Sequence, residues 1–256
     1  MFCIVTAADI EFKTAAGLLT ESSYSTEDGI LVCRGRFADR RLAILKSEVG
    51  AHGFAQRLTA HLRNNKYDAL VVAGLAGALD PNLKTGDAVV FDICYNARTD
   101  NGTLIACDDK LSQLISETLV ESGQECFRGA GVTVDRIITR ASEKIDLGAR
   151  YRATAVDMET YDSLSVCADF GLSATALRVV SDDAASDLPD FNRAIKPDGQ
   201  MNSWRMAAAI MMSPINSIRF LLSIKRVLSS LRSSLQTIFG ALEGGRLTVD
   251  KEGSSG

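Results

Sequence analysis

Short apolar runs recur along most of the chain, and polar or small residues separate them. Runs of this length, rich in β-branched side chains, are typical of buried strands. Strands are predicted over residues 2–7, 29–36, 41–46, 68–73, 88–94, 127–133 and 173–180, and stretches of helical periodicity predict helices through Leu19, Arg63 and Glu121 and over 141–150 and 158–170. Strands that alternate with helices indicate an α/β domain, with a mixed, largely parallel central sheet flanked by helices.

Capping residues help to place several of these helices. Asp9 is a suitable N-cap for the first helix, with Glu11 in its first turn, and the pair Asp108-Asp109 can cap the helix through Glu121. Gly171 follows the helix over 158–170, where a glycine commonly ends a helix. Residues 182–200 are polar and contain two prolines, which predicts a loop.

The C-terminal part of the chain has a different pattern. After Pro214, leucine and isoleucine recur at helical spacing, and residues 201–242 contain five basic residues and no acidic one. This predicts a long basic amphipathic helix. Two alternatives stay open for this helix. It packs on protein, either the domain or a partner subunit, or it docks through residues 213–242 on an anionic membrane surface. We therefore divide the chain into an α/β domain (1–200), a helical extension (201–242) and a disordered tail (243–256).

Composition narrows the possible classes of protein. With 256 residues, 46% of them hydrophobic, the chain can bury one large core, and it lacks the roughly 18 consecutive apolar residues of a membrane span. The six cysteines are scattered without a C-x-x-C pair, which predicts buried free thiols in a cytoplasmic protein; membrane docking would place it on the inner membrane face. The chain has only two histidines, His52 and His61, which argues against zinc and against His-based triads. The body over residues 1–200 is net acidic and the segment over 201–242 is net basic, whereas a nucleic-acid-binding domain would carry its basic surface on the main fold.

Candidate chemistry centres on two nearby segments. Glu159 lies at the start of a predicted helix, and Arg178 and Asp182 lie at opposite ends of a short apolar run that is typical of a buried strand. A helix followed by a strand places the two elements side by side, so all three residues can share one cleft. The small residues Gly74, Ala76 and Gly77 after the strand over 68–73 would let a ligand approach the backbone. Each feature alone has an ordinary structural explanation, such as a helix cap or an ion pair. Together they favour a catalytic site.

Four segments in register resemble the nucleoside phosphorylase/nucleosidase superfamily. They are Gly74-Leu75-Ala76-Gly77-Ala78-Leu79, Lys84-Thr85-Gly86-Asp87-Ala88-Val89-Val90, Val156-Asp157-Met158-Glu159 and Arg178-Val179-Val180-Ser181-Asp182. Within this superfamily the chain is similar to the methylthioadenosine/S-adenosylhomocysteine nucleosidases, and its basic C-terminal helix resembles the hopanoid-associated phosphorylase branch. The resemblance covers residues 1 to about 185.

The resemblance implies cleavage of the N-glycosidic bond of an adenine-type nucleoside, and it assigns roles to individual residues. Asp182 would protonate the leaving purine, and Glu11 would position the nucleophile. Arg178 would lie between Glu159 and Asp182 as an orienting charge. Glu159 and Met158 would hold the ribose. Ser181, Ile137 and Ile138 would contact the base. The backbone at Gly74, Ala76 and Gly77 would lie near the nucleophile. No metal and no cofactor are implied, apart from phosphate as a candidate co-substrate. By the same resemblance the protein forms a homo-oligomer.

Two departures from the family pattern concern the nucleophile and the substrate. Leu75 stands where the nucleosidases carry a serine, and the strand over 68–73 does not end in the arginine that binds phosphate in many phosphorylases. Hydrolysis and phosphorolysis therefore both stay open. The preferred substrate is a lipid-linked nucleoside such as adenosylhopane. The alternatives are a methylthioadenosine/S-adenosylhomocysteine nucleosidase and a non-catalytic nucleoside-binding protein.

Overall fold

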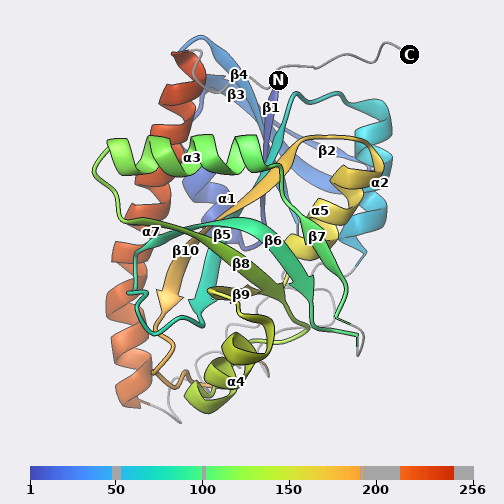
Figure 1. Ribbon diagram of the computed structural model, residues 1–256. Coiled ribbons are helices and arrows are strands. Elements are labelled where there is room, and N and C mark those ends of the chain that lie inside the picture. Colours follow the sequence, from blue (N-terminus) through green and yellow to red (C-terminus); the bar gives the residue numbers. More distant parts are fainter. Residues whose placement is uncertain (48–52, 100–101, 191, 193–213, 245–256) are drawn as a thin grey trace.

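A computed structural model describes residues 1–47, 53–99, 102–190, 192 and 214–244, with only the backbone of 214–222. Its strands form one mixed sheet, and helices cover both faces of this sheet (Figure 1). The predicted α/β class is therefore confirmed.

The elements follow each other in an order close to the predicted one. The strands are β1 (Phe2–Thr6), β2 (Thr20–Glu27), β3 (Ile30–Phe37), β4 (Arg40–Lys46), β5 (Leu70–Ala78), β6 (Ala88–Asn96), β7 (Leu104–Ala106), β8 (Cys126–Thr133), β9 (Ala155–Asp157) and β10 (Ala174–Asp182). The helices are α1 (Asp9–Ala16), α2 (Phe54–Asn64), α3 (Asp109–Glu121), α4 (Ala141–Tyr151), α5 (Thr160–Asp169) and α7 (Pro214–Glu243).

Strand pairing brings the ends of distant segments together. β5 lies between β1 and β10 and is parallel to both, and β10 also pairs antiparallel with β6. β9 joins the end of β5 to the end of β8, and β4, β3 and β2 extend the sheet beyond β1. The carboxyl ends of β1, β5 and β10 therefore meet at one edge, where ligands commonly bind in α/β proteins.

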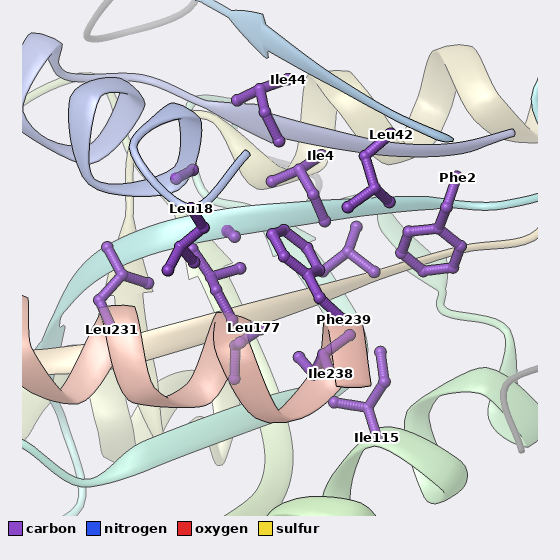
Figure 2. Close-up of a cluster of buried hydrophobic side chains, with 14 of the residues drawn as sticks. Phe2, Ile4, Leu18, Leu42, Ile44, Ile115, Leu177, Leu231, Ile238 and Phe239 are labelled. Atoms are coloured by element: carbon purple, nitrogen blue, oxygen red, sulfur yellow. The ribbon is translucent and has the colours of Figure 1, made fainter. Parts of the chain in front are cut away.

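The core consists mainly of two clusters, one on each face of the sheet. On one face, Ile4 and Leu177 pack with Ile115 of α3 and with Ile238 and Phe239 of α7 (Figure 2). The other face packs against α2 and α5. Helix α7 is thus part of the domain core.

The inner side of α7 is the apolar stripe seen in the sequence. Its buried residues Val227, Leu231, Leu235, Ile238, Phe239 and Leu242 all belong to the first cluster. The basic residues Lys225, Arg226 and Arg232 are exposed. Packing against the domain, one of the two alternatives for this helix, is therefore confirmed for its described side chains. The predicted boundary at residue 200 and the predicted tail from residue 245 on lie outside the described residues. Among the helices of the described ranges, none is long and apolar enough to cross a membrane.

Four local predictions were wrong. The first helix ends at Ala16, and its N-cap is Ala8; the side chain of Asp9 instead pairs with Lys46. Strand β2 was missed because its residues are almost all exposed, so they show no apolar alternation, and it is held by pairing with β3. The glycine-rich run after residue 73 is a continuation of β5, where pairing with β10 and β9 outweighs the low strand propensity of glycine. The two three-residue strands, β7 and β9, were also missed.

The cysteines and the described histidine have structural positions. All six cysteines are free, and only Cys126 among them is not fully buried. The ring of His61 stacks on Tyr67, and its Nε2 lies 2.7 Å from the hydroxyl of Tyr67. The prediction of buried free thiols is therefore confirmed for all the cysteines except the half-buried Cys126, and His61 packs inside the domain, whereas His52 lies outside the described residues.

Candidate functional site

A cavity of about 200 Å³ opens at the edge where β1, β5 and β10 end. In Figure 1 the arrowheads of β5 and β10 point towards α4, which lies beside this edge. The residues that line the cavity are Ala7, Ala8, Glu11, Leu75, Ala76, Gly77, Val134, Arg136, Ile137, Ile138, Val156, Asp157, Met158, Glu159, Ser181, Asp182 and Leu188.

Backbone N–H groups hold Glu11 in a fixed position. Its Oε2 accepts hydrogen bonds from the backbone nitrogens of Ala7 and Ala8, at 3.0 and 2.9 Å. The bond to Ala8 is local, because a glutamate at the third helical position can reach back to the N-cap. The other oxygen, Oε1, accepts from the nitrogen of Leu75 in β5, at 2.8 Å. The nearly buried carboxylate thus ties α1 to β5 and faces the cavity.

Arg178 organises the carboxylates at the start of α5. Its side chain is 1% exposed, and its Nη2 lies 2.6 Å from Oδ2 of Asp157 and 3.7 Å from Oε2 of Glu159. The same nitrogen donates to Oγ1 of Thr160, at 2.7 Å. Burial by itself would lower the pKa of the Arg178 guanidinium, but Asp157, Glu159 and Glu11 outweigh burial and raise that pKa above its usual value. Arg178 therefore stays charged and orients the segment that carries Glu159.

Register between β5 and β10 explains the two glycines of the predicted backbone loop. Arg178 lies opposite Gly74, and Asp182 lies opposite Gly77. A Cβ atom at Gly74 would lie 2.6 Å from Nη1 of Arg178 and 2.8 Å from Oε1 of Glu11. At Gly77 it would lie 3.2 Å from Oδ2 of Asp182. Glycine at these positions lets functional side chains cross directly over the backbone.

Both oxygens of Asp182 have partners. The hydroxyl of Ser181 donates to Oδ1, at 2.5 Å, and Nζ of Lys144 lies 2.5 Å from Oδ2. Asp182 is 7% exposed, and Lys144 is fully buried. A shift in register after Val180 turns the end of β10 so that both Ser181 and Asp182 line the cavity.

Apolar side chains form the opposite wall, and two polar residues fix its backbone. Asn192 bonds to both backbone groups of Ile137, with its Oδ1 2.7 Å from the nitrogen and its Nδ2 2.9 Å from the oxygen. Arg98 donates to the carbonyls of Val134 and Met158 and pairs with Asp162 at 2.5 Å. The wall can therefore present a firm apolar surface to a planar base or to a sugar.

The structure brings nine of the predicted site residues into the cavity wall: Glu11, Ala76, Gly77, Ile137, Ile138, Met158, Glu159, Ser181 and Asp182. Gly74 and Arg178 instead contact each other in the layer beneath it. Arg178 was expected between Glu159 and Asp182, but it bonds to the Asp157–Thr160 segment, and Asp182 pairs with Lys144. Lys144, Asp157, Thr160 and Arg98 were missed.

The fold and the cavity together indicate an enzyme that cleaves glycosidic bonds. Several fixed carboxylates face an apolar wall at the strand ends of an α/β sheet, and carboxylates can supply the acid–base catalysis and the charge stabilisation that this cleavage needs. Among the described residues, no group of three or more histidine, cysteine or acidic side chains is arranged to hold a metal ion.

Comparison with known proteins identifies the family. Residues 2–213 match the Phosphorylase superfamily, and the chain belongs to it, which confirms the prediction of an enzyme of the nucleoside phosphorylase and nucleosidase class. A 5'-methylthioadenosine/S-adenosylhomocysteine nucleosidase from Actinobacillus succinogenes is 27% identical over 193 residues, which cover 70% of this chain and 84% of the relative.

Solved structures share the fold at lower identity. The 5'-methylthioadenosine/S-adenosyl homocysteine nucleosidase of Campylobacter jejuni is 18% identical, with a TM-score of 0.74 over 95% of this chain and 98% of its own. The futalosine hydrolase of Helicobacter pylori is 20% identical, with a TM-score of 0.68 over 87% of this chain and 95% of its own.

Proposed function

We propose that the protein hydrolyses the N-glycosidic bond of an adenine-type nucleoside and releases the free base. The observation that carries this proposal is the separation of three carboxylates around one cavity, each with its own partners. Glu11 is held by backbone N–H groups, Glu159 lies next to Arg178, and Asp182 lies between Ser181 and Lys144. Such different environments suit the three tasks of nucleophile, sugar and leaving group.

Each task follows from the chemistry of bond cleavage. Positive charge grows on the ribose as the bond breaks, and a carboxylate at the sugar hydroxyls, Glu159, stabilises this charge. The purine leaves as a poor anion unless it is protonated, and Asp182 is placed to serve as the acid, with Ser181 beside it. Glu11 accepts a proton from a water molecule that attacks the anomeric carbon. Met158, Ile137 and Ile138 pack against the sugar and the base.

Charge favours water over phosphate as the nucleophile. Four carboxylates line the cavity, those of Glu11, Asp157, Glu159 and Asp182. The cations at the cavity are already paired: buried Arg178 with Asp157 and Glu159, buried Lys144 with Asp182, and Arg136 of the wall with Glu143. Because the carboxylates outnumber these cations, a phosphate dianion next to Glu11 would be repelled. Phosphorolysis would require cationic groups from elsewhere.

Leu75, which stands where the nucleosidases carry a serine, favours a nucleoside with an apolar group at its 5′ position. Leu75 lines the cavity and donates its backbone N–H to Glu11, so its side chain adds apolar surface without disturbing that contact. A lipid-linked nucleoside such as adenosylhopane is the specific candidate, and methylthioadenosine, a substrate of the related nucleosidases by their names, is the alternative. Because the described apolar stripe of α7 is buried, docking on a membrane would use other residues, such as the exposed basic side chains.

The test is release of adenine from adenosine, methylthioadenosine and a lipid nucleoside, each with and without phosphate. Hydrolysis yields free ribose sugar at a rate independent of phosphate; strict dependence on phosphate would refute the hydrolytic assignment. Absence of adenine from every substrate would favour a binding protein.

Asp182→Asn is expected to lower kcat by about 10²–10⁴-fold, because it removes the acid. Glu159→Gln is expected to lower it by about 10²–10³-fold, because it removes charge stabilisation of the ribose. Asp146→Asn, at an exposed carboxylate of α4, is the matched control and should keep wild-type activity. Full activity in both cavity variants, with folding unchanged, would contradict the assigned roles.

A further inference from the structure

Helix α4 buries a single residue, and this residue is a lysine. Lys144 is fully buried, whereas the other ten residues of α4 are at least partly exposed. Withdrawal of an ammonium group from water is unfavourable unless all of its N–H groups find acceptors. The helix is therefore docked by a charged group at the position where an apolar anchor would be expected.

The contacts of Lys144 account for its three N–H groups. Nζ donates to Oδ2 of Asp182 at 2.5 Å, to the carbonyl of Asp183 at 2.8 Å and to the carbonyl of Ser186 at 3.0 Å. One acceptor is thus the proposed acid, and two are backbone carbonyls that cannot take a proton. A neutral amine keeps two N–H groups for these carbonyls, and its lone pair can accept from a protonated Asp182.

We propose that Lys144 supplies the proton that Asp182 passes to the leaving purine. This inference rests on the proposed function. The proton moves from Nζ to Oδ2, and the O–H then turns about its C–O bond towards the cavity. As the bond between the ribose and the purine nitrogen breaks, its electron pair goes to the purine and the ring takes the proton from Oδ2. Water adds to the sugar and gives its own proton to Glu11. After the products leave, Glu11 loses this proton to bulk water, and Asp182 takes a proton from bulk water and passes it back to Lys144.

Lys144 therefore acts through Asp182, and it matters only when the leaving group needs a proton. This gives a readout that a purely structural lysine would not change. Adenosine requires protonation of its base, whereas a 4-nitrophenyl riboside releases a stable anion without it. The two substrates present the same sugar to Glu159 and Glu11.

The experiment compares both substrates in the wild-type protein, Lys144→Met and Lys144→Arg. Methionine keeps the length of the side chain and has no proton to give, whereas arginine keeps the charge and holds its proton at all accessible pH values. We expect kcat on adenosine to fall by about 10²–10⁴-fold in both variants. Cleavage of the nitrophenyl riboside should stay within about threefold of wild type, which also shows that the variants fold.

The possible outcomes separate this proposal from the proposed function. Lack of activity of the wild-type protein on both substrates would overturn both. If the wild type is active, equal losses on the two substrates would show that Lys144 is structural, and unchanged adenosine cleavage in Lys144→Met would show that the proton comes from elsewhere. Substantial adenosine activity in Lys144→Arg but not in Lys144→Met would show that residue 144 contributes a fixed positive charge and supplies no proton. Each of these three outcomes overturns the proton supply and leaves the hydrolase assignment in place.

Discussion

Gly74→Ala tests the floor of the cavity most directly. The added methyl group would lie 2.6 Å from Nη1 of Arg178, 2.8 Å from Oε1 of Glu11 and 3.0 Å from its Cδ, all shorter than ordinary van der Waals contact. Neither side chain can move away easily. Arg178 is fixed by Asp157 and Thr160, and Glu11 is fixed by three backbone N–H groups. The clash must therefore displace charged groups or the backbone of β5.

The magnitude follows from similar insertions into packed interiors. Overpacking by one methyl group costs about 1–3 kcal/mol of unfolding free energy, and each kcal/mol lowers Tm by about 2–4 °C in a domain of this size. Activity should fall more sharply, because a shift of about 1 Å at a catalytic carboxylate can lower the rate by about 10²-fold.

Thermal denaturation and adenine release together measure both effects of Gly74→Ala. Gly240→Ala is the matched control: a Cβ at this helical position meets nothing within 4 Å, so the change should be neutral or stabilising. Wild-type Tm and kcat in Gly74→Ala would refute the reasoning that Glu11 and Arg178 cross the strand at this glycine.

Two further predictions concern buried charges outside the reaction itself. Arg178→Met should lower the unfolding free energy by about 3–5 kcal/mol, because it leaves the fully buried carboxylate of Asp157 without its cation. Urea denaturation measures this loss, and adding Asp157→Asn to the same chain should recover part of it. The control is Arg140→Met, which removes an exposed ion pair with Asp187 and should change the unfolding free energy little. Burial lowers the pKa of His61 below 6.5, so the unfolded state binds more protons than the folded state and stability should fall as the pH drops below 6.5. His61→Gln should flatten this dependence of the unfolding free energy on pH. An unchanged slope would contradict a lowered pKa of His61 in the folded protein.

The sequence predicted the fold where the hydrophobic pattern is local. Strand β1 is an almost entirely apolar run buried on both faces, so composition alone identified it. Helix α3 was placed accurately because its N-cap, Asp108, accepts from the backbone nitrogen of Leu111 as expected. In contrast, β2 and the glycine-rich end of β5 depend on their neighbours, since their own residues favour exposure or turns.

The same distinction explains which parts of the site could be predicted. Glu11 follows β1 and Asp182 ends β10, so the topology of these parallel strands sends both to one edge, whereas Glu159 was placed there from its position at the start of the helix before β10. Lys144 lies on a helix whose sequence, Ala-Ser-Glu-Lys-Ile-Asp-Leu, reads as an ordinary amphipathic surface in which isoleucine faces the core. The structure reverses this reading: Ile145 is 57% exposed, and Lys144 is buried against a carboxylate that lies 38 residues away in the sequence. No local pattern predicts such a reversal, because the partner that makes burial of the lysine favourable is supplied by β10. A buried charged residue at the position of an apolar anchor, such as Lys144, can therefore be recognised only once the fold has placed its partner beside it.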